Sequence, residues 1–70
     1  MIKYYKLLDV LNRREMTKEE LRIKLNLSSA TIAKISKNEF ISLRVINDIC
    51  KFLNCQPGDI MEYVPDKNNL

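Results

Sequence analysis

Two segments with the apolar spacing of helices are separated by only three residues, Asn26, Leu27 and Ser28. Asparagine tolerates the left-handed backbone conformation that ends helices, and serine is a preferred residue just before a helix. Leu27 between them provides an apolar plug. A connection this short prevents the two helices from packing side by side as a long hairpin, and it is typical of a helix-turn-helix. No other feature of the sequence limits the fold as strongly.

The rest of the chain also predicts helices. Apolar residues recur at helical spacing, and only one glycine and two prolines interrupt the sequence, which disfavours a β fold rich in turns. We expect helices over residues 2–14, 18–25, 29–37 and 43–54, and a short last helix that begins at Pro57. The predicted fold is all-α, a compact five-helix domain over residues 1–66, followed by a frayed C-terminal tail over residues 67–70.

Polar residues mark where these helices begin. Thr17 and Glu20 stand three residues apart before an apolar run, which is the pattern of a capping box. Ser28 and Ser42 precede the next two predicted helices, where a side-chain hydroxyl can accept a backbone N–H. The start signals therefore agree with the apolar spacing.

The predicted helix over residues 29–37 is bare on its outer side. Ile32 and Ile35 are its only large apolar residues, and they mark its buried side. The opposite side carries small residues and two lysines: Ser29, Ala30, Ala33, Lys34 and Lys37. Small side chains let a helix approach the floor of the DNA major groove, and lysines reach guanine edges or phosphates. The same spacing also fits an exposed helix whose alanines and lysines only favour helicity and solubility.

Net charge and cysteine content limit which partners and cofactors the protein is expected to have. A net charge of +3 admits a nucleic-acid partner without requiring one. Cys50 and Cys55 lack the spacing of a zinc site and histidine is absent, so we expect no metal or other cofactor and a protein of the reducing cytoplasm. No apolar run is long enough for a membrane helix.

Together with the turn, two motifs resemble a known family of regulators: "SSATIAK" at residues 28–34 and "ICKFLNCQPGDIMEY" at residues 49–63. They resemble the Cro and phage-repressor type of helix-turn-helix regulator, the XRE superfamily. The resemblance spans roughly residues 4–66. It implies a compact five-helix fold, repressor-like activity and a homodimer that binds palindromic operators in double-stranded DNA. A single domain leaves no room for a ligand sensor, so we expect no small-molecule ligand.

The resemblance also implies roles for individual residues. Ser29, Ala30 and Lys34 occupy positions where members of the family read bases, and Ala33 lies beside them on the same side. Positions near phosphates are occupied by Thr17, Lys18 and Lys37, to which we add the basic residue Arg44.

Two positions depart from the family pattern. Arg22 stands where a small residue often packs between the two helices, so its stem must run along their contact. Asn26 stands where the family often has glycine, for which asparagine is a tolerable substitute.

A second apolar strip faces away from the main one on the fourth predicted helix. Val45 and Phe52 are seven residues apart and form this strip. The simpler interpretation is that the C-terminal segment folds back and covers them. The alternative is a dimer contact, because exposed apolar patches usually mark interfaces.

No group of residues suggests catalysis. The sequence has no histidine, glycine-rich phosphate loop or nucleophile beside a base, so we do not expect an enzyme. The main alternative to a DNA-binding regulator is a protein-binding adaptor, such as an antitoxin-like partner, that would use the strip of Val45 and Phe52.

Overall fold

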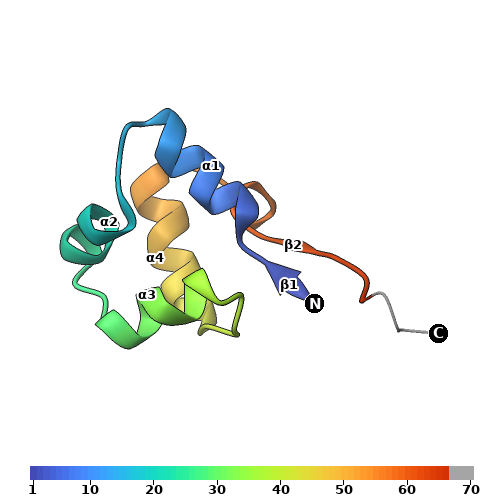
Figure 1. The fold of residues 1–70 in the computed structure, drawn as a ribbon. Helices are drawn as coiled ribbons and strands as arrows, with labels where there is room; N and C mark the ends of the chain where they lie inside the picture. The colour runs from blue at the N-terminus through green and yellow to red at the C-terminus, as the bar shows by residue number, and fades with distance from the viewer. Residues whose placement is uncertain (67–70) are drawn as a thin grey trace.

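The computed structural model describes residues 1–66 of the chain, and the predicted tail over 67–70 lies outside the described residues. It contains four α-helices: α1 (Tyr5–Arg13), α2 (Lys18–Leu25), α3 (Ser29–Ser36) and α4 (Leu43–Leu53). Figure 1 shows α4 in the centre, with α1 near its C-terminal end, α3 near its N-terminal end and α2 at its side. The all-α prediction is confirmed.

The predicted count of five helices is wrong. After α4 the chain forms only one 3₁₀ turn, η1 (Pro57–Asp59), in which Gly58 disfavours continued helix. The two ends of the chain then pair as a short antiparallel ribbon of β1 (Ile2–Lys3) and β2 (Glu62–Tyr63). The first predicted helix therefore begins later than expected, because residues 2 and 3 pair with the C-terminal segment.

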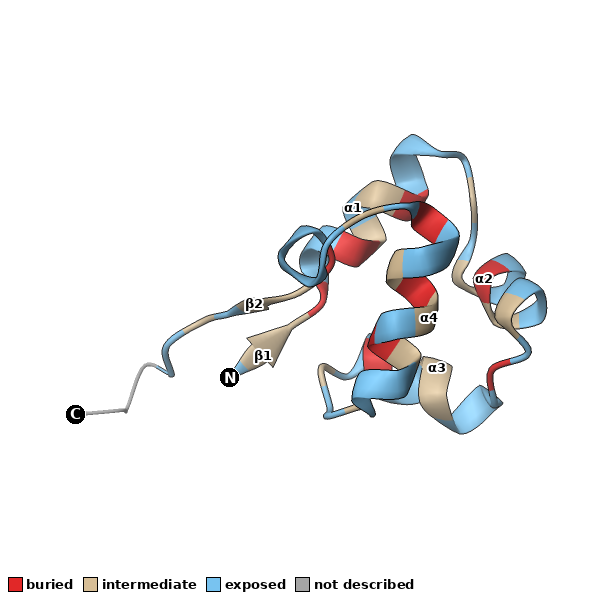
Figure 2. Cartoon of the chain, turned by 180° about the vertical axis from the view of Figure 1, so that it is seen from behind, coloured by how far each residue is buried: buried red, intermediate tan, exposed pale blue. Residues whose placement is uncertain are grey.

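One core joins all four α-helices, and α4 contributes Ile46, Ile49 and Leu53 to it. Figure 2 shows these buried positions along the side of α4 that faces the other helices. The remaining buried side chains come from the other elements: Tyr4, Leu7, Leu11, Leu21, Leu27, Ile35 and Ile60. Cys50 is half-buried and packs against this core.

Each α-helix is followed by a residue with a left-handed backbone. These residues are Glu15, Asn26, Asn38 and Asn54, with φ between 53° and 56°. In each case the next residue donates its N–H to the carbonyl oxygen five positions back, at 2.8 to 3.0 Å. This is the Schellman motif, which satisfies carbonyls that a helix end leaves unpaired. The chain therefore ends its helices without glycine, mostly by means of asparagine.

Tyr4 ties the start of α1 to the loop after α3. Its side chain is 2% exposed, and its hydroxyl donates a hydrogen bond of 2.7 Å to the carbonyl oxygen of Glu39. Its backbone N–H donates to Asn38 Oδ1 at 2.9 Å. Burial raises the pKa of the Tyr4 phenol, so it remains a hydrogen-bond donor at neutral pH. Segments more than thirty residues apart in sequence are thereby held together.

Replacing Glu15 with glycine is expected to raise the free energy of unfolding by about 0.5–1 kcal/mol, measured by urea titration. Glycine adopts the φ of 56° found here without a clash from a β-carbon. Asn38→Gly is the matched control, because it relieves the same backbone but removes the side-chain oxygen that Tyr4 uses. We expect it to destabilise the fold by about 1 kcal/mol. Equal effects of the two substitutions would contradict this explanation.

Candidate nucleic-acid interface

Local hydrogen bonds fix the connection between α2 and α3. Asn26 adopts φ 53° and ψ 43°, which ends α2 as predicted. Leu27 is buried beneath the turn, and Ser28 Oγ accepts a hydrogen bond from the N–H of Thr31 at 3.1 Å. At the other end of α2, Thr17 and Glu20 form the predicted capping box. The two helices therefore have the short connection and firm ends of a helix-turn-helix.

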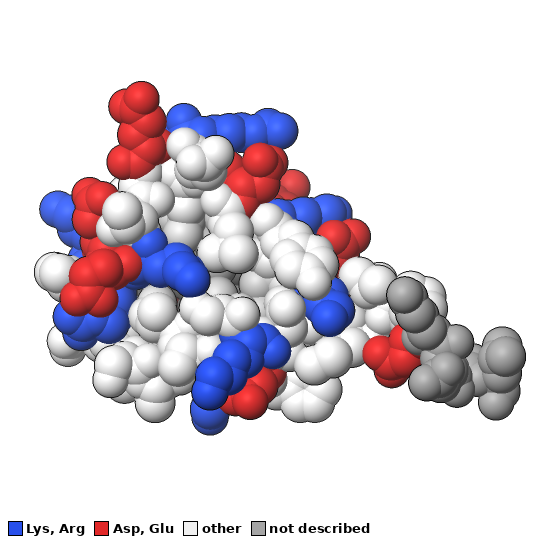
Figure 3. Space-filling model, in the orientation of Figure 1, with Lys and Arg blue, Asp and Glu red and all other residues white. Residues whose placement is uncertain are grey.

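The outer face of α3 consists of Ser29, Ala30, Ala33, Lys34 and Lys37, all of which are exposed. On the opposite side, Ile35 is fully buried and Ile32 is half-buried against the core. The orientation of the helix thus agrees with the predicted one. Figure 3 shows mostly uncharged side chains over α3, with basic side chains and an adjacent acidic one near its C-terminal end. The arrangement leaves small side chains and lysines facing outward, where a groove of DNA could receive them.

Two of the predicted phosphate contacts make hydrogen bonds within the protein. Thr17 Oγ1 accepts from the N–H of Glu20 at 3.1 Å and lies 3.2 Å from Glu20 Oε1. Lys18 Nζ donates to Ser36 Oγ at 2.8 Å, which links the start of α2 to the end of α3. The prediction from sequence missed this link, since the two residues are 18 positions apart and no local pattern joins them. An ammonium group carries three hydrogens, so this bond leaves Lys18 able to meet a phosphate as well.

Arg22 forms a bidentate ion pair with Glu19. Its Nε and Nη2 donate to the two carboxylate oxygens at 2.8 and 2.7 Å. The hydrogen bonds from Arg22 lower the pKa of the Glu19 carboxyl, and those to Glu19 raise the pKa of the guanidinium. The Arg22 side chain is 31% exposed, so its stem is partly covered while its guanidinium stays at the surface. Arg22 thereby compensates the negative charge of Glu19, one of the two acidic residues in the first turn of α2.

The remaining predicted cations gather at one end of the molecule. Lys37 follows α3 directly and Arg44 lies in the first turn of α4, and both are exposed. Figure 1 shows these two helix ends joined by the loop over residues 37–42, which the hydrogen bonds of Tyr4 hold beside the start of α1. Within residues 1–66, the three salt bridges leave Lys34, Lys37 and Arg44 unpaired. Their charges are therefore available to an anionic partner.

The same end also carries two apolar side chains that the prediction from sequence did not single out. Phe40 is 74% exposed and Leu43 is 79% exposed, more than any other large hydrophobic residue described. The available signal was the pair Phe40–Ile41, since only one of two adjacent side chains in an extended loop can face the core. Ile41 takes that place, because it packs against the core.

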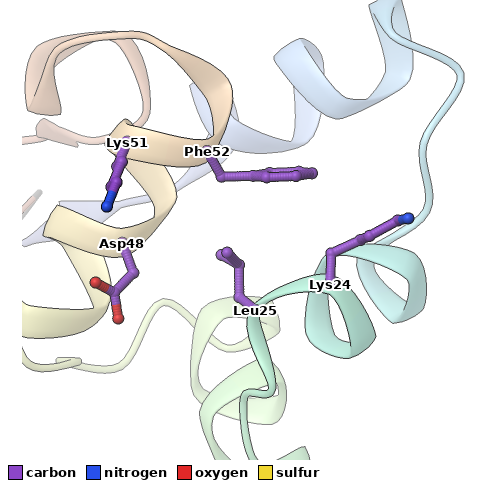
Figure 4. Close-up of a pocket in the computed structure, with 5 residues that line it drawn as sticks. All are labelled: Lys24, Leu25, Asp48, Lys51 and Phe52. Atoms are coloured by element: carbon purple, nitrogen blue, oxygen red, sulfur yellow. The ribbon is translucent and has the colours of Figure 1, made fainter.

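The predicted strip of Val45 and Phe52 is divided in the structure. Val45 is half-buried against the core, whereas Phe52 is 39% exposed. The simpler interpretation from sequence is wrong for the described residues, because β2 runs along β1 instead of covering Phe52. Phe52 and Leu25 face each other across a groove of about 490 Å³, named here the Phe52 groove and drawn in Figure 4. Three charged residues complete its lining: Lys24, Asp48 and Lys51.

The cysteines and acidic residues offer no metal site within the described part of the chain. Cys50 and Cys55 are free thiols in contact, as expected for the two side chains that a Schellman motif brings together. Burial, with the neighbouring Cys50, raises the pKa of the Cys55 thiol. Over residues 1–66 there is no cluster of three histidine, cysteine or acidic side chains that could hold a metal ion. Nor does this part of the chain contain a helix long and apolar enough to cross a membrane.

Comparisons with known proteins agree with this geometry. The model of the Cro/C1-type HTH DNA-binding domain matches residues 6–66. An uncharacterized HTH-type transcriptional regulator of Bacillus subtilis (strain 168), YozG, is 39% identical over 61 residues, which covers 84% of this chain and 73% of that protein. The crystal structure of the transcriptional regulator VanUg (Form II) superposes with a TM-score of 0.90 at 46% identity, and the match covers 93% of this chain and 87% of that one. The chain therefore belongs to the family of Cro/C1-type helix-turn-helix DNA-binding domains.

Proposed function

We propose that this protein is a sequence-specific transcriptional repressor that binds palindromic operators as a homodimer, with α3 inserted in the major groove. The observation that carries the proposal is the outer face of α3, where small residues and unpaired lysines are exposed on a helix held firmly by its own caps. Family membership and relatives described as transcriptional regulators support it. A bound dimer would repress by covering promoter DNA, and it would act in the cytoplasm.

In this proposal the contacts divide into two groups. Base edges would be read by four residues of the outer face of α3: Ser29, Ala30, Ala33 and Lys34. Phosphates would be held by Lys37, Arg44 and Lys18, and by the backbone N–H groups that follow Thr17 at the start of α2. The first group gives sequence preference, and the second gives affinity and orientation.

The Phe52 groove is the proposed dimer contact. It carries apolar walls together with both signs of charge, on Asp48 and on Lys24 and Lys51. A surface of mixed charge is complementary to itself when two copies meet about a two-fold axis, because each acid can face a base of the other copy. Val45, which lies mostly inside its own chain, would contribute only at the edge.

A second candidate function uses the same groove for a different protein. An adaptor or antitoxin-like partner would place Phe52 in the interface with that protein. A stable complex with such a protein, combined with no retention of DNA at moderate salt, would favour this candidate over the repressor.

Binding of duplex DNA is expected to depend strongly on salt. If each of two chains neutralises about four phosphates, the slope of log K against log salt concentration should be roughly −7, because counterions are released. Fluorescence anisotropy of labelled duplex DNA at several salt concentrations measures this slope. A slope near zero, or no binding to any duplex at low salt, would contradict the repressor function.

Replacing Lys34 or Lys37 with alanine is expected to weaken DNA binding in two different ways. Lys34 lies one turn beyond Ala30 on the outer face, so Lys34→Ala should cost about 1–3 kcal/mol and relax the preference at one base pair of each half-site. Lys37 lies at the helix end, so Lys37→Ala should weaken binding to all sequences alike and reduce the salt slope by about one per contact. A panel of single-base operator variants separates the two effects. If Lys34→Ala leaves the base preference intact, specificity must come from Ser29, Ala30 and the shape of the DNA.

Operators selected from random duplex DNA are expected to be two-fold symmetric, with half-sites about 34 Å apart. One helix of this size reads too few base pairs to specify a site alone. Phe52→Glu should abolish the dimer, as measured by sedimentation, while thermal unfolding stays cooperative. Single asymmetric sites bound by one chain would contradict the dimer, and loss of the fold in Phe52→Glu would indicate that Phe52 serves its own chain.

A further inference from the structure

We propose that the loop between α3 and α4, together with the first residue of α4, is a second DNA-contacting element, in which Phe40 of the loop and Leu43 of α4 pack against deoxyribose and base edges of the minor groove. This inference rests on the proposed function, because it assumes that α3 lies in the adjacent major groove. It extends that function by assigning a role to apolar side chains outside the outer face of α3.

These two side chains are more exposed than any other large hydrophobic residue described. Phe40 is 74% exposed and Leu43 is 79% exposed, although a domain of 70 residues has only a small core. They stand on either side of Ile41 and Ser42, in a segment that the helix-turn-helix itself does not need. Exposed apolar side chains that gather at one place usually mark a contact with another molecule.

The loop is held in place on both sides of Phe40, so the exposure of Phe40 is a property of the fold. On one side of Phe40, Tyr4 bonds both the carbonyl of Glu39 and the side chain of Asn38. On the other side, Ile41 packs against the core, and Ser42 Oγ accepts from the N–H of Val45 at 3.2 Å. Phe40 is therefore anchored on both flanks and points outward.

The charges around Phe40 and Leu43 are mostly positive. Lys37 precedes Phe40 by three residues, Arg44 follows Leu43 directly, and all four side chains are exposed. Glu39 is the one acidic residue between them, so residues 34–44 carry three basic side chains against one acidic. A second copy of this surface would bring cation against cation. Duplex DNA offers phosphates for the cations and C–H edges of its sugars for the apolar side chains.

The loop also lies where the edge of a major groove would be. Figures 1 and 2 both show it beside the C-terminal end of α3 and the N-terminal end of α4. A helix that lies in the major groove brings its end to the sugar-phosphate strand at the groove edge, and the minor groove lies beyond that strand. Apolar side chains in a minor groove favour base steps that open easily, so this element would read the shape of the DNA next to each half-site.

The experiment compares Phe40→Ala and Leu43→Ala with the wild-type full-length chain on an operator selected by the wild type. Each substitution is expected to weaken binding by about tenfold, because apolar surface is lost from the contact. The salt slope should stay unchanged, because an apolar contact releases no counterion, whereas Lys37→Ala should lower it. Urea unfolding and sedimentation without DNA should both match the wild type. Tyr63→Ala, at an exposed aromatic residue of the ribbon, is the matched control and should bind as the wild type does.

Wild-type affinity of both Phe40→Ala and Leu43→Ala would overturn the inference and leave the proposed function intact. Loss of the dimer in the absence of DNA would also overturn it, because the apolar pair would then belong to a protein interface. If the wild-type chain itself binds no duplex, the proposed function fails together with the inference.

Discussion

The direction of α3 depends on one backbone conformation, that of Asn26. With φ at 53°, the chain turns sharply enough for Leu27 to reach the core and for Ser28 to cap the next helix. A residue that resisted this conformation would lengthen α2 by part of a turn. Because each residue advances a helix by about 100°, the buried and outer sides of α3 would then no longer match the core. The outer face of α3 is thus set by the residue that ends the helix before it.

A small core makes the long-range hydrogen bonds matter. In addition to the bonds made by Tyr4, Arg14 Nη2 donates to the carbonyl oxygen of Leu53 at 2.7 Å, which joins the ends of α1 and α4. Domains of this size bury a modest share of their surface, so a few such bonds are a substantial part of the net stability. They also act over a distance, because Tyr4 holds the loop that presents Phe40. A change near the N-terminus would thereby be felt at the C-terminal end of α3.

The parts of the structure that the sequence predicts correctly are those with local causes. The capping box of Thr17, the left-handed Asn26 and the side of α3 marked by Ile35 each depend on residues within a few positions of one another. The parts that it does not predict depend on residues far apart in sequence. The ribbon, the link between Lys18 and Ser36, and the course of the C-terminal segment away from Phe52 leave no local pattern. Base and phosphate contacts remain predictions, because the geometry shows which side chains are exposed and not what they touch.

The proposed function requires that duplex DNA meets the outer face of α3. Backbone amide shifts of nitrogen-15-labelled protein, followed by NMR while a selected duplex is added, show where the DNA binds. We expect saturable shifts concentrated over residues 29–44 and the first turn of α2, with the ribbon at Glu62 and Tyr63 unaffected. Saturable shifts that leave residues 29–37 unchanged would contradict the proposed function, because the DNA would then be bound by a different surface.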